Sequence, residues 1–238
     1  MLRLEGKTLG VFVAPEFEDL EFWVPVMRLR EEGARVLVIG IAQETVRGKH
    51  CLEASPDKLA REVRADQVDG LVIPGGWAPD KLRRDADVLR LVRECHAQGK
   101  VIGIICHAGW VAASAGIVRG MRFTGSRGIK DDLEAAGATW VDEAAFREGN
   151  LVWGRVVADI PDFCRELVAA LTGESAAQRE HAGARRSRAD WQGDASAPQT
   201  PFHQPSWPAE PRTIPPPPVV KPPRRRTSPI VEGQAPEG

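Results

Sequence analysis

Cys106 is the residue of this chain whose position is best suited to chemistry. It follows the apolar run Val101–Ile105, which predicts a buried strand, and it precedes residues 107–115, which predict a short helix. A sharp turn from strand to helix holds a side chain at the carboxyl edge of a sheet, where open α/β folds bind ligands. The positive end of the helix lowers the pKa of a thiol, and the thiolate is the nucleophilic form. We therefore predict a reactive thiol here rather than an inert buried one.

Residues beside Cys106 and at the end of a second predicted strand could assist a nucleophile. His107 could pair with the thiolate or carry a proton, although a histidine beside a cysteine is more often an ordinary surface or core residue. Gly75 and Gly76 follow the apolar run 68–73, so their N–H groups could form an oxyanion pocket beside Cys106. A Pro-Gly-Gly segment is also typical of a plain tight turn.

Acidic residues gather where the first predicted strand gives way to the first helix. Glu16, Glu18, Asp19 and Glu21 lie there, and acids at a helix start ordinarily interact with the helix dipole. This junction also lies at the carboxyl edge of the sheet. We therefore expect one buried carboxyl, in its protonated form, to donate a hydrogen bond to the Cys106 thiolate.

The other three cysteines lack such a context. Cys51, Cys95 and Cys164 are scattered, with no CxxC pair and no spacing typical of metal ligands. Isolated cysteines are commonly small buried apolar residues, so we expect these three to be inert. The sequence gives no reason to expect a metal ion or another cofactor.

Apolar runs and helical patterns alternate along the chain as far as residue 171. Strands are predicted at 7–15, 35–41, 68–73, 101–105 and 151–153, and helices at 20–32, 79–98, 107–115, 129–136 and 160–171. Several of these strands are apolar at consecutive positions, which is typical of a parallel sheet covered on both faces. The predicted fold class is α/β, with a doubly wound, mostly parallel sheet between helices.

Composition separates a predicted domain, residues 1–173, from a tail, residues 174–238. The tail is rich in proline and arginine and contains four consecutive prolines at 215–218. Such a segment buries too little apolar surface to offset the entropy of ordering it, so we predict a disordered extension. It could dock on an SH3-like or anionic partner, but a solvated extension without a partner is the more common case.

Charge and hydropathy exclude several classes of protein. The 238 residues include 32 Lys and Arg against 33 Asp and Glu, for a net charge of −1, whereas a dedicated nucleic-acid-binding domain is usually basic. No apolar run reaches the about 18 residues that span a membrane, and the charged residues 1–7 are too short for a signal peptide. We expect a cytoplasmic protein that binds neither membranes nor nucleic acid.

Five ordered segments resemble the DJ-1/PfpI superfamily, in particular its PfpI-like branch. They are APEFEDLEF, IPGGWAPDKLR, VIGIICHAGW, GIKDDLEAAGATWVD and WGRVVAD, and the resemblance covers about residues 4–171. It implies a flavodoxin-like fold with Cys106 at a nucleophile elbow and Glu18 as the carboxyl hydrogen-bonded to its sulfur. It also implies that Gly75, Gly76 and the amide of His107 form the oxyanion pocket.

The resemblance also implies a site completed by self-association, in a dimer or a higher oligomer. In the PfpI-like branch an acid from a neighbouring subunit orients the histidine, and Asp80 occupies that position, where the family commonly has Glu. Arg155 matches an arginine near the site or the dimer interface. This chain also has Ala108 and Gly109 where the family usually has Gly-Pro, and Ser126 where it often has Tyr or His.

The family's activities all begin with a thiolate that attacks a carbonyl carbon. They are intracellular peptidase, glyoxalase without glutathione, and deglycase repair of methylglyoxal-modified protein or nucleotide, so a small carbonyl compound or a peptide is the expected substrate. A protein of a different class stays open, namely a non-catalytic stress sensor or chaperone that uses oxidation of Cys106 to sulfinate as its signal. A glutamine amidotransferase is disfavoured because only His181 and His203, both in the tail, follow His107.

Overall fold

The computed structural model describes residues 2–174, so from residue 175 onward the predicted tail lies outside the described residues. The strands are β1 (Thr8–Phe12), β2 (Arg35–Gly40), β3 (Val46–Arg47), β4 (Glu53–Ala54), β5 (Lys58–Leu59), β6 (Gly70–Ile73), β7 (Val101–Ile105), β8 (Arg122–Phe123), β9 (Thr139–Trp140), β10 (Ala145–Glu148) and β11 (Leu151–Gly154). The α-helices are α1 (Asp19–Glu31), α2 (Ala78–Leu82), α3 (Ala86–Ala97), α4 (Gly109–Ala115), α5 (Lys130–Ala135) and α6 (Ile160–Thr172). Short 3₁₀ turns are η1 (Ala60–Glu62), η2 (Ala65–Gln67), η3 (Cys106–Ala108), η4 (Arg127–Ile129) and η5 (Val157–Asp159).

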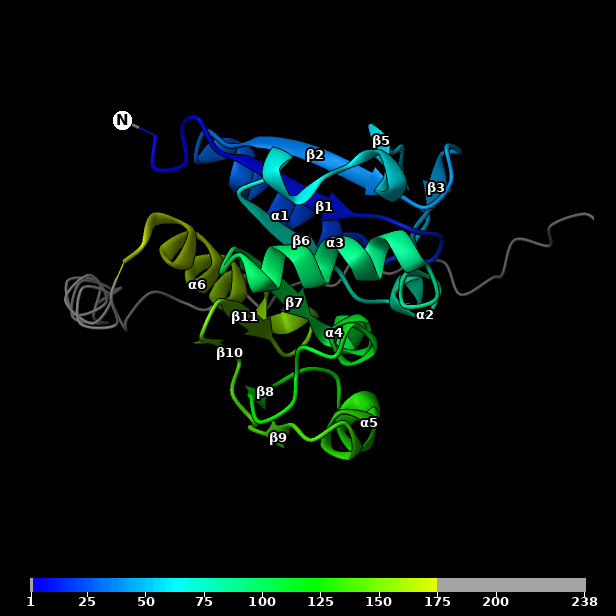
Figure 1. Cartoon of the computed structure of the whole chain (residues 1–238). Helices are drawn as coiled ribbons and strands as arrows, with labels where there is room; N and C mark the ends of the chain where they lie inside the picture. The colour runs from blue at the N-terminus through cyan, green and yellow to red at the C-terminus, as the bar shows by residue number, and fades with distance from the viewer. Residues whose placement is uncertain (1, 175–238) are drawn as a thin grey trace, which may run out of the picture. The chain divides into compact units, whose positions relative to one another are not determined.

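The central sheet has seven strands in the order β10-β11-β7-β6-β1-β2-β5. All neighbouring pairs are parallel except β10 with β11. Helices α3 and α4 pack together over one face, and α1 and α6 pack together over the other (Figure 1). This arrangement confirms the predicted doubly wound α/β fold, because strands covered on both faces must be apolar throughout.

The strand order places three loops at one point of the sheet. Strand β1 pairs with β6, and β6 pairs with β7, all three in parallel. The chain leaves β1 toward β2 on one side and leaves β6 toward β7 on the other, so the crossovers diverge and a crevice forms at the carboxyl ends. The segments after β1, β6 and β7 therefore meet at this edge.

Two features of the fold differ from the sequence-based prediction. The single helix predicted at 79–98 is wrong: the chain forms α2 and α3, because the Asp85 carboxylate accepts hydrogen bonds from the amides of Asp87 and Val88 and starts a new helix. The strands β3, β4, β5, β8 and β9 were not predicted, since two residues each are too few to show a periodic pattern. The antiparallel strand β10 at the edge of the sheet was not predicted either.

Within residues 2–174, no helix is both long enough and apolar enough to cross a bilayer.

Candidate active site

Cys106 stands at a strained elbow directly after β7. Its backbone has φ 60°, in the left-handed region that non-glycine residues avoid at a cost of about 1 kcal/mol or more. The chain then makes the turn η3 before α4 begins at Gly109. The side chain is half-buried. The predicted strand-to-helix elbow is therefore present, with a 3₁₀ turn between strand and helix.

The carboxyl beside the thiol belongs to Glu21, so the prediction that it belongs to Glu18 is wrong. Glu21 is fully buried, and its side chain is hydrogen-bonded to Cys106. Glu18 instead binds Lys49, with Oε2 3.0 Å from Nζ. Glu18 is the extended residue before α1, whereas Glu21 lies inside the first turn, so α1 directs Glu21 toward the sheet and Glu18 toward the β3–β4 loop.

Gly75 supports this carboxyl rather than a substrate oxyanion. Its amide donates to Oε2 of Glu21 at 2.9 Å, so the predicted role of Gly75 in an oxyanion pocket is wrong. A Cβ at Gly75 would lie 2.5 Å from Oε2 of Glu21 and 2.7 Å from Cβ of Cys106, which only glycine avoids. The amides of Gly76 and His107 donate to the sulfur of Cys106 instead. These two N–H groups stabilise negative charge at the site.

Burial raises the pKa of both the Cys106 thiol and the Glu21 carboxyl, and the charge of Glu21 raises that of the thiol further. Burial, with a smaller contribution from the charge of Glu18, raises the pKa of Glu21 to about 7. Burial first, and then the charge of Glu21, raise the pKa of Cys106 above its ordinary value, although the amides of Gly76 and His107 oppose this. The predicted lowering of the thiol pKa is therefore wrong in direction. Desolvation exceeds the stabilisation that the short η3 turn supplies.

Because the charge of Glu21 disfavours ionisation of the Cys106 thiol, the two groups titrate as a coupled pair. Oε2 of Glu21 accepts from the Gly75 amide, and Oε1 is buried, with no nitrogen or oxygen partner among residues 2–174. When Glu21 carries the proton, its repulsion of the thiolate disappears and the sulfur becomes easier to ionise.

His107 lies against the same sulfur. Its Nδ1 is 3.2 Å from Sγ of Cys106. Burial, and then the positive charge of Lys49, lower the pKa of His107. The imidazole is therefore neutral at physiological pH and can accept a proton at one ring nitrogen. This placement is the one expected for a proton carrier beside a nucleophile.

Two predicted residues make other contacts within this chain. Asp80, on α2, is exposed and forms an ion pair with Arg84 at 2.9 Å. Arg155 follows β11, whose Gly154 pairs with Ile105, but its guanidinium binds Asp159 at 2.9 Å and Asp142 at 2.7 Å. The ion pairs raise the pKa of Arg155. Within residues 2–174 of one chain, neither Asp80 nor Arg155 forms a hydrogen bond with Cys106.

Lys49 is a neighbour of the site that the sequence did not indicate. Its ammonium binds Glu18 and interacts electrostatically with Glu21 and Cys106, and these acids raise its pKa. The β3–β4 loop is held in place by the Asp19 carboxylate, which accepts hydrogen bonds from the amides of His50 and Leu52, each at 2.8 Å. The strands β3 and β4 have two residues each and show no recognisable pattern in the sequence. Only tertiary contacts therefore place Lys49 beside the site.

The remaining cysteines divide into two kinds. Cys95 and Cys164 are buried, and burial raises the pKa of each thiol to about 11, as expected for inert residues. Cys51 is exposed, so the expectation that it is a buried residue is wrong. It lies in the tight turn between β3 and β4, which is at the surface.

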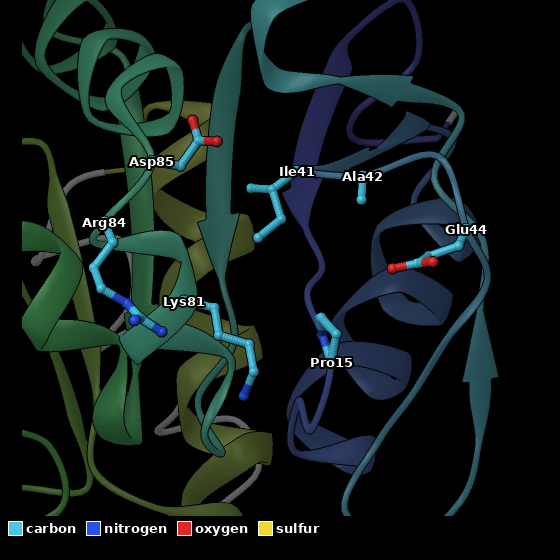
Figure 2. A pocket seen from close by; sticks show the side chains of 7 residues that line it. All are labelled: Pro15, Ile41, Ala42, Glu44, Lys81, Arg84 and Asp85. Carbon is cyan, nitrogen blue, oxygen red and sulfur yellow. The ribbon is translucent and has the colours of Figure 1, made fainter. Parts of the chain in front are cut away.

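A groove of about 430 Å³ lies beside the α2–α3 segment. Figure 2 shows residues from the α2–α3 segment facing residues that follow β1 and β2. Its lining residues are Pro15, Ile41, Ala42, Glu44, Lys81, Arg84 and Asp85. Lys81 binds Glu16 at 2.7 Å and Arg84 binds Asp80, so these cations already have partners. The groove contains none of the residues that surround Cys106.

Comparisons with known proteins point to one family. A family model described as the DJ-1/PfpI family matches residues 7–170. A Pyrococcus abyssi protein named a deglycase is 39% identical over 158 residues, which are 66% of this chain and 95% of that protein. An Escherichia coli protein named protein/nucleic acid deglycase 2 is 37% identical over 167 residues, 68% of this chain and 96% of that protein.

A solved structure from Anabaena variabilis has a similar fold. It is a two-domain protein with DJ-1/ThiJ/PfpI-like and ferritin-like domains, is 34% identical and superposes with a TM-score of 0.68. The match covers 72% of this chain and 49% of that longer one, so this chain spans about half of that protein. Together with the family match and the Cys106 elbow, these similarities show that the chain belongs to the DJ-1/PfpI family.

Proposed function

We propose that this protein is a cysteine-dependent enzyme in which the Cys106 thiolate attacks the carbonyl carbon of a 2-oxoaldehyde or of the adduct that such an aldehyde forms on protein or nucleotide. The observation that carries this proposal is the buried Glu21 carboxyl beside Cys106, whose pKa is raised to about 7. A carboxyl with this pKa can both give and take a proton at neutral pH, which is the requirement for general acid–base catalysis.

For methylglyoxal, the sulfur adds to the aldehyde carbon, forming a C–S bond while the carbonyl oxygen takes the proton of Glu21. The hydrogen on that carbon then leaves as a proton, for which neutral His107, 3.2 Å from the sulfur, is the nearest base. The adjacent carbonyl carbon receives a proton, which gives the thioester of a 2-hydroxy acid. Water hydrolyses the thioester and restores the thiol. The sum is the addition of one water molecule, with no external oxidant or reductant.

The same first step serves removal of an adduct from an amino group. At the hemiaminal carbon of the adduct a C–S bond forms as the C–N bond breaks, and the nitrogen leaves as an amine with a proton from His107 or Glu21. The product is the same hemithioacetal that methylglyoxal forms, and it follows the route above to the thioester and the 2-hydroxy acid. The names of the two deglycases above support this reading. Peptide hydrolysis would use the same thiolate and the same proton donor, and it is therefore included in the test.

The test compares turnover of methylglyoxal, a methylglyoxal-modified peptide and casein by the wild type and by Cys106→Ser. We expect the first two to be consumed and the variant to be inactive on both. Casein hydrolysis as the dominant activity would instead identify a peptidase. Absence of all turnover, together with clean oxidation of Cys106 to sulfinate by dilute peroxide, would identify the redox sensor and contradict the proposed enzyme.

We also propose that self-association completes the site, with Asp80 of one subunit orienting His107 of another. In support, Asp80 is exposed and, among residues 2–174, no acid forms a hydrogen bond with His107. Mixing Asp80→Ala with Cys106→Ser after mild dissociation should restore part of the activity, because some sites then combine intact residues from both. Full activity of Asp80→Ala alone would show that each subunit works by itself.

A further inference from the structure

Two tryptophans stand beside the nucleophile and have no part in the chemistry proposed above. Trp77 comes directly after Gly76, and Trp110 lies one helical turn after His107. Their ring centroids are 5.4 and 5.3 Å from the imidazole of His107. The two indoles are 6.5 Å apart at their centroids, with planes only 28° from parallel. The three rings form an aromatic cluster next to the sulfur.

Trp110 is held firmly in this cluster. Its Nε1 donates to the Asp132 carboxylate at 2.7 Å. The guanidinium of Arg83 lies over its ring at 5.7 Å, and Arg83 is itself held by a hydrogen bond to Ser114 at 2.9 Å. These contacts leave Trp110 little freedom. Its indole therefore forms a fixed support for whatever binds beside it.

Trp77 is different because much of its indole is exposed. The residue is 49% exposed, one of the few large apolar residues in residues 2–174 that face solvent to this extent. An indole is the largest apolar side chain, and covering it removes more apolar surface from water than covering any other residue would. A solvent-facing tryptophan beside a nucleophile is thus a surface that a bound molecule can cover.

The side of Cys106 that faces Glu21 and Gly75 is closely packed, since even a methyl group on Gly75 would not fit there. On another side His107 lies against the sulfur, with Nδ1 3.2 Å from Sγ. A carbonyl carbon bonded to Sγ can therefore carry its larger group away from Glu21, past His107. That is the side on which the rings of Trp77 and Trp110 lie.

We propose that Trp77 and Trp110 form the part of the site that binds the group attached to the reacting carbonyl, and that they select aromatic or other flat apolar groups. This inference rests on the proposed thiolate attack on a carbonyl. A flat ring can cover Trp77 while its reactive carbonyl stays at Cys106, whereas a methyl group covers little of it. Aromatic pairs add about 0.5–1.5 kcal/mol beyond the area that they bury. The enzyme therefore prefers an arylglyoxal to methylglyoxal by about tenfold in kcat/KM.

The first experiment measures kcat and KM for phenylglyoxal and methylglyoxal with the wild type, Trp77→Ala and Trp77→Phe. We expect Trp77→Ala to lose most of the tenfold preference through a higher KM for phenylglyoxal, and Trp77→Phe to keep most of it. Met27→Ala is the matched control, because Met27 is 61% exposed but lies on α1, away from the rings. An unchanged preference in Trp77→Ala would overturn the proposal, and melting temperatures verify that each variant is folded.

The second experiment does not depend on turnover. It labels Cys106 with 2-bromoacetophenone and with bromoacetone and measures the saturation constant KI and the limiting rate of each reaction by mass spectrometry. Tighter KI for the aryl reagent, lost in Trp77→Ala but not in Met27→Ala, supports the aromatic selection even if neither glyoxal is turned over; the proposed function alone would then have failed. Equal KI values for the two reagents in the wild type would contradict the aromatic selection itself.

Discussion

Cys51 and Cys106 have the same unusual backbone and very different surroundings. Both are free thiols, with φ 72° and φ 60° in the left-handed region. At Cys51 the conformation closes the turn between β3 and β4, where its amide donates to the carbonyl of Gly48 at 3.1 Å. At Cys106 it aims the sulfur at Glu21 and His107. A strained backbone at a cysteine is therefore no evidence of a nucleophile unless groups that handle protons surround the sulfur.

Of these two cysteines, the more exposed one is the one that lacks proton-handling groups around its sulfur. Cys51 is the exposed thiol, and a small unselective reagent reaches it freely. Cys106 is half-buried, and its sulfur is contacted by a carboxyl, two amides and an imidazole. We therefore expect simple alkylation to label both residues, and only turnover to distinguish them.

The largest expected difference between the two cysteines is in turnover. Cys106→Ser should lower kcat/KM for methylglyoxal on the order of a thousandfold or more, because the attacking atom is lost. Cys51→Ser should change it by less than about twofold, as expected for a surface residue without a role in the site. Steady-state kinetics on both purified variants make the comparison. Comparable losses in the two variants would mean that Cys51 also belongs to the reaction.

The next largest effect concerns the two acids at the start of α1. Glu21→Gln removes the carboxyl beside Cys106 that can give or take a proton near neutral pH, and loss of a general acid–base typically costs about 10²- to 10⁴-fold in rate. Glu18→Gln, the matched control, removes the partner of Lys49 and a charge that contributes to the raised pKa of Glu21, but it leaves the carboxyl beside the thiol and should cost much less. The pH dependence of kcat/KM, measured for all three proteins, should lose its inflection near pH 7 in Glu21→Gln alone. The same inflection in that variant would assign it to another group.

The free energy of unfolding should depend on the ionisation of the Glu21 carboxyl. The pKa of Glu21 is raised from 4.5 to about 7 in the folded protein, so between these values the folded state holds a proton that the unfolded state has released. Stability therefore falls as pH rises through this window and levels off above it, by roughly 3 kcal/mol in total. Urea unfolding at about pH 4.5 and about pH 8 should show that Glu21→Gln gains stability relative to the wild type at the higher pH. A difference that is independent of pH would mean that Glu21 is ionised throughout.

The smallest effect tests whether the strain at Cys51 has a function. Glycine adopts a φ near 72° without steric cost, so Cys51→Gly should raise the free energy of unfolding by up to about 1 kcal/mol, less the extra flexibility of the unfolded chain. Cys51→Ala keeps the Cβ atom and the strain, and it is the matched control. Thermal unfolding measures both. Turnover should stay at the wild-type level in each, and a loss would show that this turn also positions Lys49.

Local sequence patterns were sufficient for the architecture and for the nucleophile. The apolar run of β7 followed at once by Cys106 predicts a buried strand with a thiol at its end, because five consecutive apolar residues fit only a strand covered on both faces. The same reasoning found β1, β2, β6 and β11, the strands that carry the sheet. These signals are local, so one sequence contains them in full.

Tertiary structure alone decided which groups surround the sulfur. Glu18 and Glu21 are the same residue type three positions apart, and only the point at which α1 starts and packs determines that Glu21 faces Cys106. Lys49 reaches the site from the loop between the two-residue strands β3 and β4. The amide of Gly75 donates its hydrogen bond to the buried Glu21 carboxyl. The pKa values of Glu21 and Cys106 follow from burial, which no spacing of residues along the chain expresses.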